Sequence, residues 1–82
     1  MSYTLDKSKK FLKSFDKLDN NTQKKAITQI SKIIKNPEIG KPMRYERKDT
    51  RELYCKPFRI SYSFNKGELI ILFIELYHKD KQ

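Results

Sequence analysis

Polar side chains that could do chemistry gather in the last third of the chain, on or beside stretches that should be strands. They are Arg51, Tyr54, Lys56, Arg59, His78 and Lys79. An arginine is always charged, and its planar guanidinium binds phosphate oxygens in pairs, so Arg59 suits the stabilisation of a phosphate group. Histidine is the residue type whose unperturbed pKa lies near neutrality, which makes His78 the natural acid or base. These types indicate phosphate binding and proton transfer.

A strand hairpin must position these side chains. Apolar and polar residues alternate from Phe58 to Phe64, which is typical of a strand with one buried face. A turn at residues 65–67 follows, and residues 69–76 are almost continuously apolar, as in a central strand buried on both faces. A third strand is expected at Arg51–Cys55. If Leu53 faces the core there, Arg51 turns away from the face that carries Arg59.

The first half of the chain predicts a short strand at residues 3–5 and two amphipathic helices. Asp6 or Ser8 should cap the first helix, and Asn20 with Gln23 resembles a capping box for the second. Asn36 and Pro37 should end the second helix. The expected fold is α+β in one domain of residues 1–82: a short N-terminal strand, an antiparallel helical hairpin and a three-stranded antiparallel meander. Local rules do not show which later strand the first one joins.

Composition limits the chemistry. One cysteine excludes an internal disulfide, and no ligand cluster for zinc or magnesium is apparent, so we expect no metal and no cofactor. The first ten residues lead into no apolar run, and the apolar stretch near the C-terminus is too short to span a membrane, so we expect a cytoplasmic protein. The net charge of +9 attracts phosphates, anionic lipid or an acidic protein. By itself the charge leaves nucleic-acid binding and mere solubility equally open.

The expected elements and several motifs resemble the RelE/ParE superfamily of toxins from toxin–antitoxin pairs, from about Tyr3 to Lys79. The motifs are the connection NPEIGKP, then RELY, then PFRISYSF, and a last strand that ends in LYHK. Arg59 within FRISY is the most specific point. In the RelE and YoeB branches such toxins cleave messenger RNA in the decoding site of the ribosome. The resemblance implies the same activity here. It also implies three partners, namely a cognate antitoxin encoded by an adjacent gene, the ribosome and messenger RNA, and a hetero-oligomer of toxin and antitoxin.

The resemblance also assigns roles to residues. Arg59 matches the strand arginine that stabilises the scissile phosphate, and His78 matches the histidine of YoeB-like members. The expected RNA-binding residues are Lys79, Lys56, Tyr54, Arg51 and Lys81. Cleavage without a metal needs one group to deprotonate the 2′-hydroxyl and another to protonate the leaving oxygen. One histidine cannot do both, so the second task falls to a lysine, a tyrosine or the ribosome.

Two other functions stay open. ParE-like members poison DNA gyrase without catalysis, and a basic RNA-binding module without toxicity would also fit the charge. His78 at the end of the last strand favours the nuclease, because gyrase poisoning needs no titratable group. Two departures from the RelE pattern count the other way: the chain ends at Gln82 without a C-terminal tyrosine, and Glu52 stands where a basic residue is common.

Overall fold

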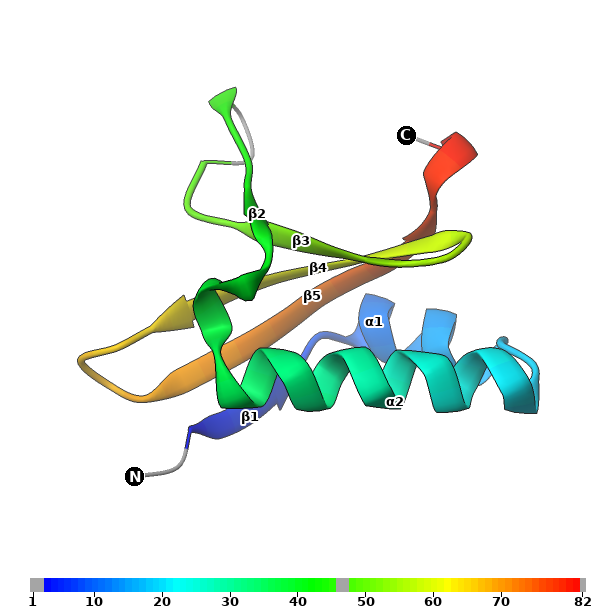
Figure 1. Cartoon of the computed structure of the whole chain (residues 1–82), viewed down its shortest axis with the longest axis horizontal. Coiled ribbons are helices and arrows are strands. Elements are labelled where there is room, and N and C mark those ends of the chain that lie inside the picture. The colour runs from blue at the N-terminus through cyan, green and yellow to red at the C-terminus, as the bar shows by residue number, and fades with distance from the viewer. Residues whose placement is uncertain (1–2, 46–47, 82) are drawn as a thin grey trace.

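The chain forms a five-stranded sheet with two helices against one of its faces, as the computed structural model shows for residues 3–45 and 48–81 (Figure 1). The elements in chain order are β1 (Thr4–Lys7), α1 (Lys9–Asp16), α2 (Asn20–Lys35), η1 (Pro37–Ile39), β2 (Lys41–Pro42), β3 (Arg51–Cys55), β4 (Phe58–Asn65), β5 (Ile70–His78) and η3 (Lys79–Lys81). This order confirms the predicted α+β fold. Within the described residues, no helix is long and apolar enough to cross a membrane.

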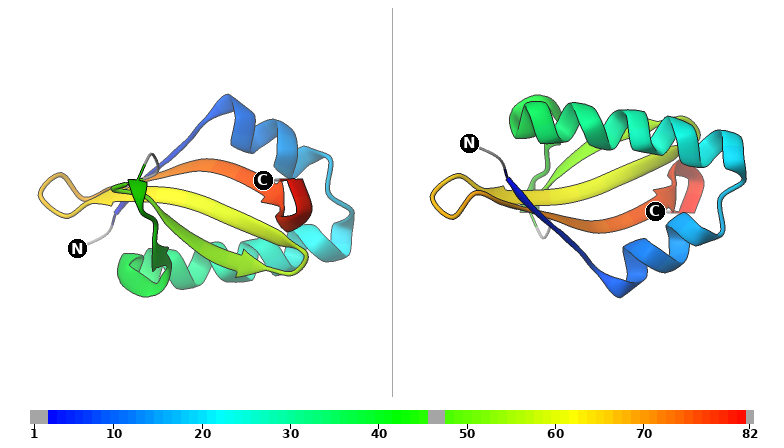
Figure 2. Two further views of the ribbon diagram at one scale, coloured as in Figure 1. Left: turned by 90° about the horizontal axis from the view of Figure 1, so that it is seen from above. Right: turned by 90° about the horizontal axis from the view of Figure 1, so that it is seen from below.

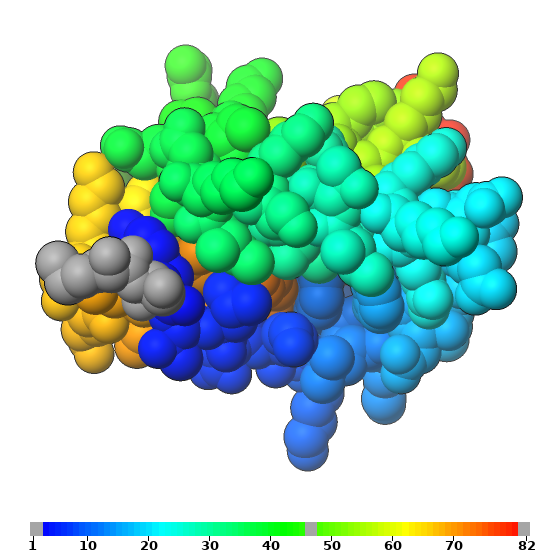
Figure 3. Space-filling model, turned by 60° about the horizontal axis from the view of Figure 1, so that its bottom comes forward, coloured from blue at the N-terminus to red at the C-terminus, as the bar shows by residue number. Residues whose placement is uncertain are grey.

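The sheet has the strand order β1-β5-β4-β3-β2. The N-terminal strand pairs in parallel with the last strand, with Thr4 opposite Ile70, and the other neighbours are antiparallel. α1 lies under β5 and α2 under β3, so both helices cover the same face and leave the opposite face open (Figure 2). The side of the molecule in Figure 3 shows α1, α2 and β1 spread over the covered face.

Side-chain caps fix both helix starts. The hydroxyl of Ser8 accepts a hydrogen bond from the backbone N–H of Phe11 at 3.0 Å, as predicted for α1. In α2 the cap is Asp19, which accepts from the N–H of Thr22 at 2.8 Å, one residue earlier than the predicted capping box. The hydrogen bonds from Thr22 lower the pKa of Asp19. Gln23 does not cap the helix. Its side-chain amide donates a hydrogen bond to the carbonyl of Phe15 at 3.0 Å, which links α2 to α1.

The core lies between the helices and the sheet. Its buried residues are Phe11, Ala26, Ile33, Cys55, Ile60, Tyr62, Ile71, Phe73 and Leu76. The prediction that β5 is buried on both faces is wrong, because Ile70 and Leu72 are only half-buried on the open face. A register irregularity between Ser61 and Tyr62 shifts the alternation of β5, so that Phe73 and Leu76 both reach the core.

Candidate functional site

Polar side chains form two cross-strand rows on the open face of the sheet. Residues directly opposite each other on neighbouring strands share a face. The strand register therefore aligns one row of Lys41, Glu52, Ser61 and Glu75. The neighbouring row consists of Tyr54, Arg59 and Tyr77, contributed by β3, β4 and β5. The predicted phosphate-binding arginine thus lies between two tyrosines.

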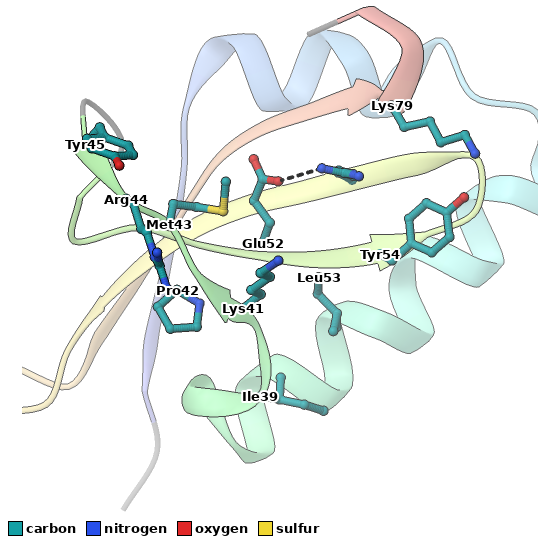
Figure 4. Close-up of a pocket in the computed structure, with 11 residues that line it drawn as sticks. Ile39, Lys41, Pro42, Met43, Arg44, Tyr45, Glu52, Leu53, Tyr54 and Lys79 are labelled. Carbon is teal, nitrogen blue, oxygen red and sulfur yellow. Dashed lines mark ion pairs between the residues drawn. The ribbon is translucent and has the colours of Figure 1, made fainter.

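A groove of about 1060 Å³ runs between this face and the segment from η1 to Tyr45, which we call the arm (residues 39–45) (Figure 4). The residues that line it are Ile39, Lys41, Pro42, Met43, Arg44, Tyr45, Glu52, Leu53, Tyr54, Arg59 and Lys79. Four of these side chains are basic and one is acidic, so the groove attracts anions. Tyr45 is 90% exposed and Tyr54 is 43% exposed, so aromatic rings are also accessible there.

Glu52 lies deep in this groove, in contact with Arg59. The Nη1 atom of Arg59 is 3.6 Å from Oε1 of Glu52, and the two side chains are 37% and 6% exposed. The hydroxyl of Tyr77 donates a hydrogen bond to the other carboxylate oxygen, Oε2. A buried carboxylate is stable only with such partners. Glu52 therefore depends on Arg59 and Tyr77, while Arg59 keeps access to the groove.

The arm is fixed at its base by a buried hydrogen-bond cluster. The hydroxyl of Tyr62 accepts from the N–H of Gly40 at 2.9 Å and donates to the carbonyl of Pro37 at 2.6 Å. Burial raises the pKa of Tyr62. Because this cluster holds η1 against the sheet, it also sets the position of the groove wall that follows.

Arg51, one of the predicted RNA-binding residues, belongs to this cluster and does not line the groove. Its Nη1 donates to the carbonyl of Glu38 at 3.0 Å and to that of Gly40 at 2.8 Å. Its guanidinium carbon lies 5.6 Å from the centre of the Phe64 ring, on the helix-covered side. Arg51 is opposite Tyr62, and Arg59 is on the other face, because side chains alternate along a strand.

The structure also does not bring His78 to Arg59. His78 is opposite Phe58, and the two rings meet edge to face with centroids 5.5 Å apart, whereas Arg59 is opposite Tyr77. The Nδ1 atom of His78 accepts a hydrogen bond from the N–H of Asp80 at 3.2 Å. His78 therefore lies on the side of Phe58, whereas Arg59 lies on the open face with Tyr77.

The other predicted residues fall into three groups. Tyr54 and Lys79 line the groove with Arg59. Lys56 lies in the β3–β4 turn and borders a separate hollow of about 260 Å³ beside α2, with Cys55, whose thiol has its pKa raised by burial. Lys81 ends η3, and its side chain lies outside the described residues.

The sequence prediction missed Glu52, Tyr77, Lys41 and Arg44 as residues of the site. Alternation along RELY places Glu52 on the same side as Tyr54, and this is a usable signal. The contact with Tyr77 comes from β5, 25 residues later, so it depends on a strand register that local patterns do not fix. No group of three metal-ligating side chains occurs in the part of the chain that the structure describes.

Comparison with known proteins agrees with this architecture. Residues 5–82 match the family model of the ParE toxin of the type II toxin–antitoxin system parDE. No curated protein matches the sequence significantly. The fold is similar to the isolated E. coli RelE toxin, with a TM-score of 0.82 at 17% identity over 98% of this chain and 87% of that chain.

Two further solved structures show the same fold. The RelBE2 toxin–antitoxin complex from Mycobacterium tuberculosis matches with a TM-score of 0.81 at 18% identity, over 96% of this chain and 100% of that chain. The YoeB/ParE toxin from Agrobacterium tumefaciens matches with a TM-score of 0.82 at 12% identity, over 92% of this chain and 96% of that chain. The family model covers almost the whole domain, including both polar rows. The chain therefore belongs to the ParE toxin family within the RelE/ParE superfamily, and it is a toxin of a type II toxin–antitoxin system.

Proposed function

We propose that this toxin cleaves messenger RNA on the ribosome, with Arg59 bound to the scissile phosphate. The observation that carries the proposal is the position of Arg59: its guanidinium is accessible in a groove lined by three further basic side chains, Lys41, Arg44 and Lys79. An arginine so placed can stabilise the charge that develops on phosphorus during cleavage.

The groove also suits a single RNA strand. Its basic side chains can contact successive phosphates. Tyr54 is next to Arg59 in the cross-strand row and Tyr45 stands on the arm, so either ring can stack on a base. A duplex would hide the base faces that these rings need, so an unpaired message is the better substrate.

The proposed partners are a cognate antitoxin, the ribosome and its message. The similar complex from Mycobacterium tuberculosis is a toxin with its antitoxin, and we extend that pairing to this chain. Ile70 and Leu72 leave half-buried apolar surface on the open face, close to the polar rows, where an apolar segment of an antitoxin could bind. A site of action on the ribosome also places the toxin in the cytoplasm.

Primer extension on a translated message after induction tests the activity. Cuts in phase with codons are expected for the wild type. Arg59→Ala should lower cleavage by about 10²–10³-fold, as when one preorganised donor is removed. Lys32→Ala is the matched control, because it removes the same charge from an exposed position on α2. Intact messages at full toxicity would refute the nuclease.

Gyrase poisoning is the second candidate, because His78 lies outside the groove and Arg59 already has a counter-ion in Glu52. A protein-binding toxin needs neither an acid nor a base. It predicts DNA breaks while messages stay intact.

A further inference from the structure

Glu52 is a charged residue buried on the face of the sheet that no helix covers. The residue is 7% exposed, although its neighbours in the other polar row, Tyr54 and Arg59, are accessible. Removing a carboxylate from water is costly even when it has an ionic partner. An uncharged polar side chain would avoid this cost, so the buried charge points to a chemical role.

We propose that Glu52 is the catalytic base of the reaction, and this inference rests on the proposed RNA cleavage. Its Oε2 atom is occupied by the Tyr77 hydroxyl, and its Oε1 atom faces Arg59, with 3.6 Å between Oε1 and Nη1. In this proposal, the ribose next to a phosphate bound at Arg59 lies beside Oε1. Since a base must lie within reach of the proton that it removes, this geometry favours Glu52 over His78.

The reaction balances without a further reagent. The Glu52 carboxylate takes the proton of the 2′-hydroxyl, and the 2′-oxygen forms a bond to phosphorus. The bond from phosphorus to the 5′-oxygen breaks, and that oxygen takes a proton from solvent water. Glu52 then returns its proton to solvent, leaving a 2′,3′-cyclic phosphate and a 5′-hydroxyl. The guanidinium of Arg59 stabilises the negative charge of the phosphorane throughout.

Tyr77 acts through Glu52 and is a positioning residue. Its hydroxyl holds Oε2, which leaves Oε1 as the oxygen directed at Arg59. Lys41 is directly opposite Glu52 on β2 and Lys79 lines the same groove, so both add positive charge that attracts the phosphates of the RNA.

The test is Glu52→Gln, which keeps the shape and the acceptor for Tyr77 but cannot take a proton. Single-turnover cleavage on programmed ribosomes should fall by about 10²–10⁴-fold. Ribosome binding should stay equal or tighten, because Arg59 loses its counter-ion. The wild-type rate should decline as the pH is lowered and the base is protonated, and this decline should be absent from the residual activity of Glu52→Gln. Glu75→Gln is the matched control, since Glu75 lies on the same face, pairs with Lys10 and does not line the groove.

Tyr77→Phe gives an independent test if the glutamine variant does not fold. It removes only the hydroxyl, and cleavage should fall about tenfold, with the acid decline of the rate moved along the pH axis. In the Glu52→Gln background the same change should have no further effect, because residues that act as a unit are not additive.

Three outcomes would overturn the assignment of Glu52. If folded Glu52→Gln cleaved at the wild-type rate, the ion pair with Arg59 would have only a structural role. If it cleaved faster than the wild type, Glu52 would inhibit the action of Arg59. If the fall of the cleavage rate at low pH disappeared in His78→Gln but persisted in Glu52→Gln, His78 would be the catalytic base. If the wild-type protein cut no messenger RNA, both the proposed nuclease activity and the proposed role of Glu52 would be overturned. The other three outcomes affect only the role of Glu52.

Discussion

Arg59 has a structural task as well as a proposed catalytic one. It is the ionic partner of a carboxylate that is only 6% exposed and that also accepts a hydrogen bond from the Tyr77 hydroxyl. Removing one partner of a buried polar group costs the desolvation of the group left behind. Loss of activity in an Arg59 variant therefore needs a measurement of folding beside it.

We predict that Arg59→Ala lowers the free energy of unfolding by about 1–3 kcal/mol, the cost of an unsatisfied buried group. The double variant Arg59→Ala with Glu52→Gln should regain most of that loss, because a neutral amide needs no counter-ion. Urea unfolding measures both. Equal stability of the wild type and Arg59→Ala would show that the ion pair contributes nothing to folding.

His78 is expected to be dispensable for cleavage. Its ring meets Phe58 and its Nδ1 accepts from the backbone of Asp80, so His78→Gln should keep cleavage within about twofold of the wild type. An acid or base must lie within hydrogen-bond reach of the proton that it transfers, and His78 does not line the groove that holds Arg59. Single-turnover rates across the pH range measure it. A drop of 10²-fold or more with intact ribosome binding would place the histidine in the reaction after all.

At the scale of elements, local patterns predict the parts of this fold that depend on neighbouring residues. The cap at Ser8 and the end of α2 at Asn36 are local, and each is confirmed. The alternation from Phe58 to Phe64 correctly predicts the strand β4, but Ser61 on its polar side is buried too. The pairing of β1 with β5 joins segments more than 60 residues apart, so no local signal identifies it. Arg59 could be placed on a face by alternation, whereas its contact with Glu52 needed the register of two strands.

The base of the arm also depends on a distant contact. A Cβ atom at Gly40 would lie 2.6 Å from the hydroxyl oxygen of Tyr62 and 3.0 Å from the carbonyl oxygen of Glu52. Glycine is required here by close approach and not by backbone conformation, since the φ angle of Gly40 is −73°. The arm, the buried tyrosine and the strand that carries Glu52 therefore meet at one residue.

We predict that Gly40→Ala destabilises the protein by about 1–3 kcal/mol, the usual cost of overpacking. It should also lower cleavage, because the arm forms one wall of the groove. Gly67→Ala is the matched control: its added Cβ would meet only the side-chain oxygen of Asn65, at 3.3 Å. Urea unfolding and single-turnover cleavage measure the two effects. Unchanged values for both would show that the arm tolerates displacement.

At the scale of the whole molecule, the net charge is +9, and basic residues lie both on the helices and along the groove. Exposed lysines such as Lys13 and Lys32 lie on the helices, away from the open face, and they suit solubility. Lys41, Arg44, Arg59 and Lys79 gather along one groove. The net charge alone does not distinguish a role in solubility from nucleic-acid binding. The basic residues of the helices and those of the groove can be substituted separately to test each role.

We predict that affinity for a single-stranded RNA oligonucleotide falls steeply as salt rises, because each phosphate contact releases a counter-ion. Lys41→Ala and Lys79→Ala should each reduce the slope of log K against log salt by about 0.7, the value for one phosphate of a single strand. Lys13→Ala should leave the slope unchanged while altering the net charge equally. Fluorescence anisotropy at several salt concentrations gives these slopes. If all three variants shifted the slope alike, the field of the whole molecule would bind RNA and the groove would have no special part in it.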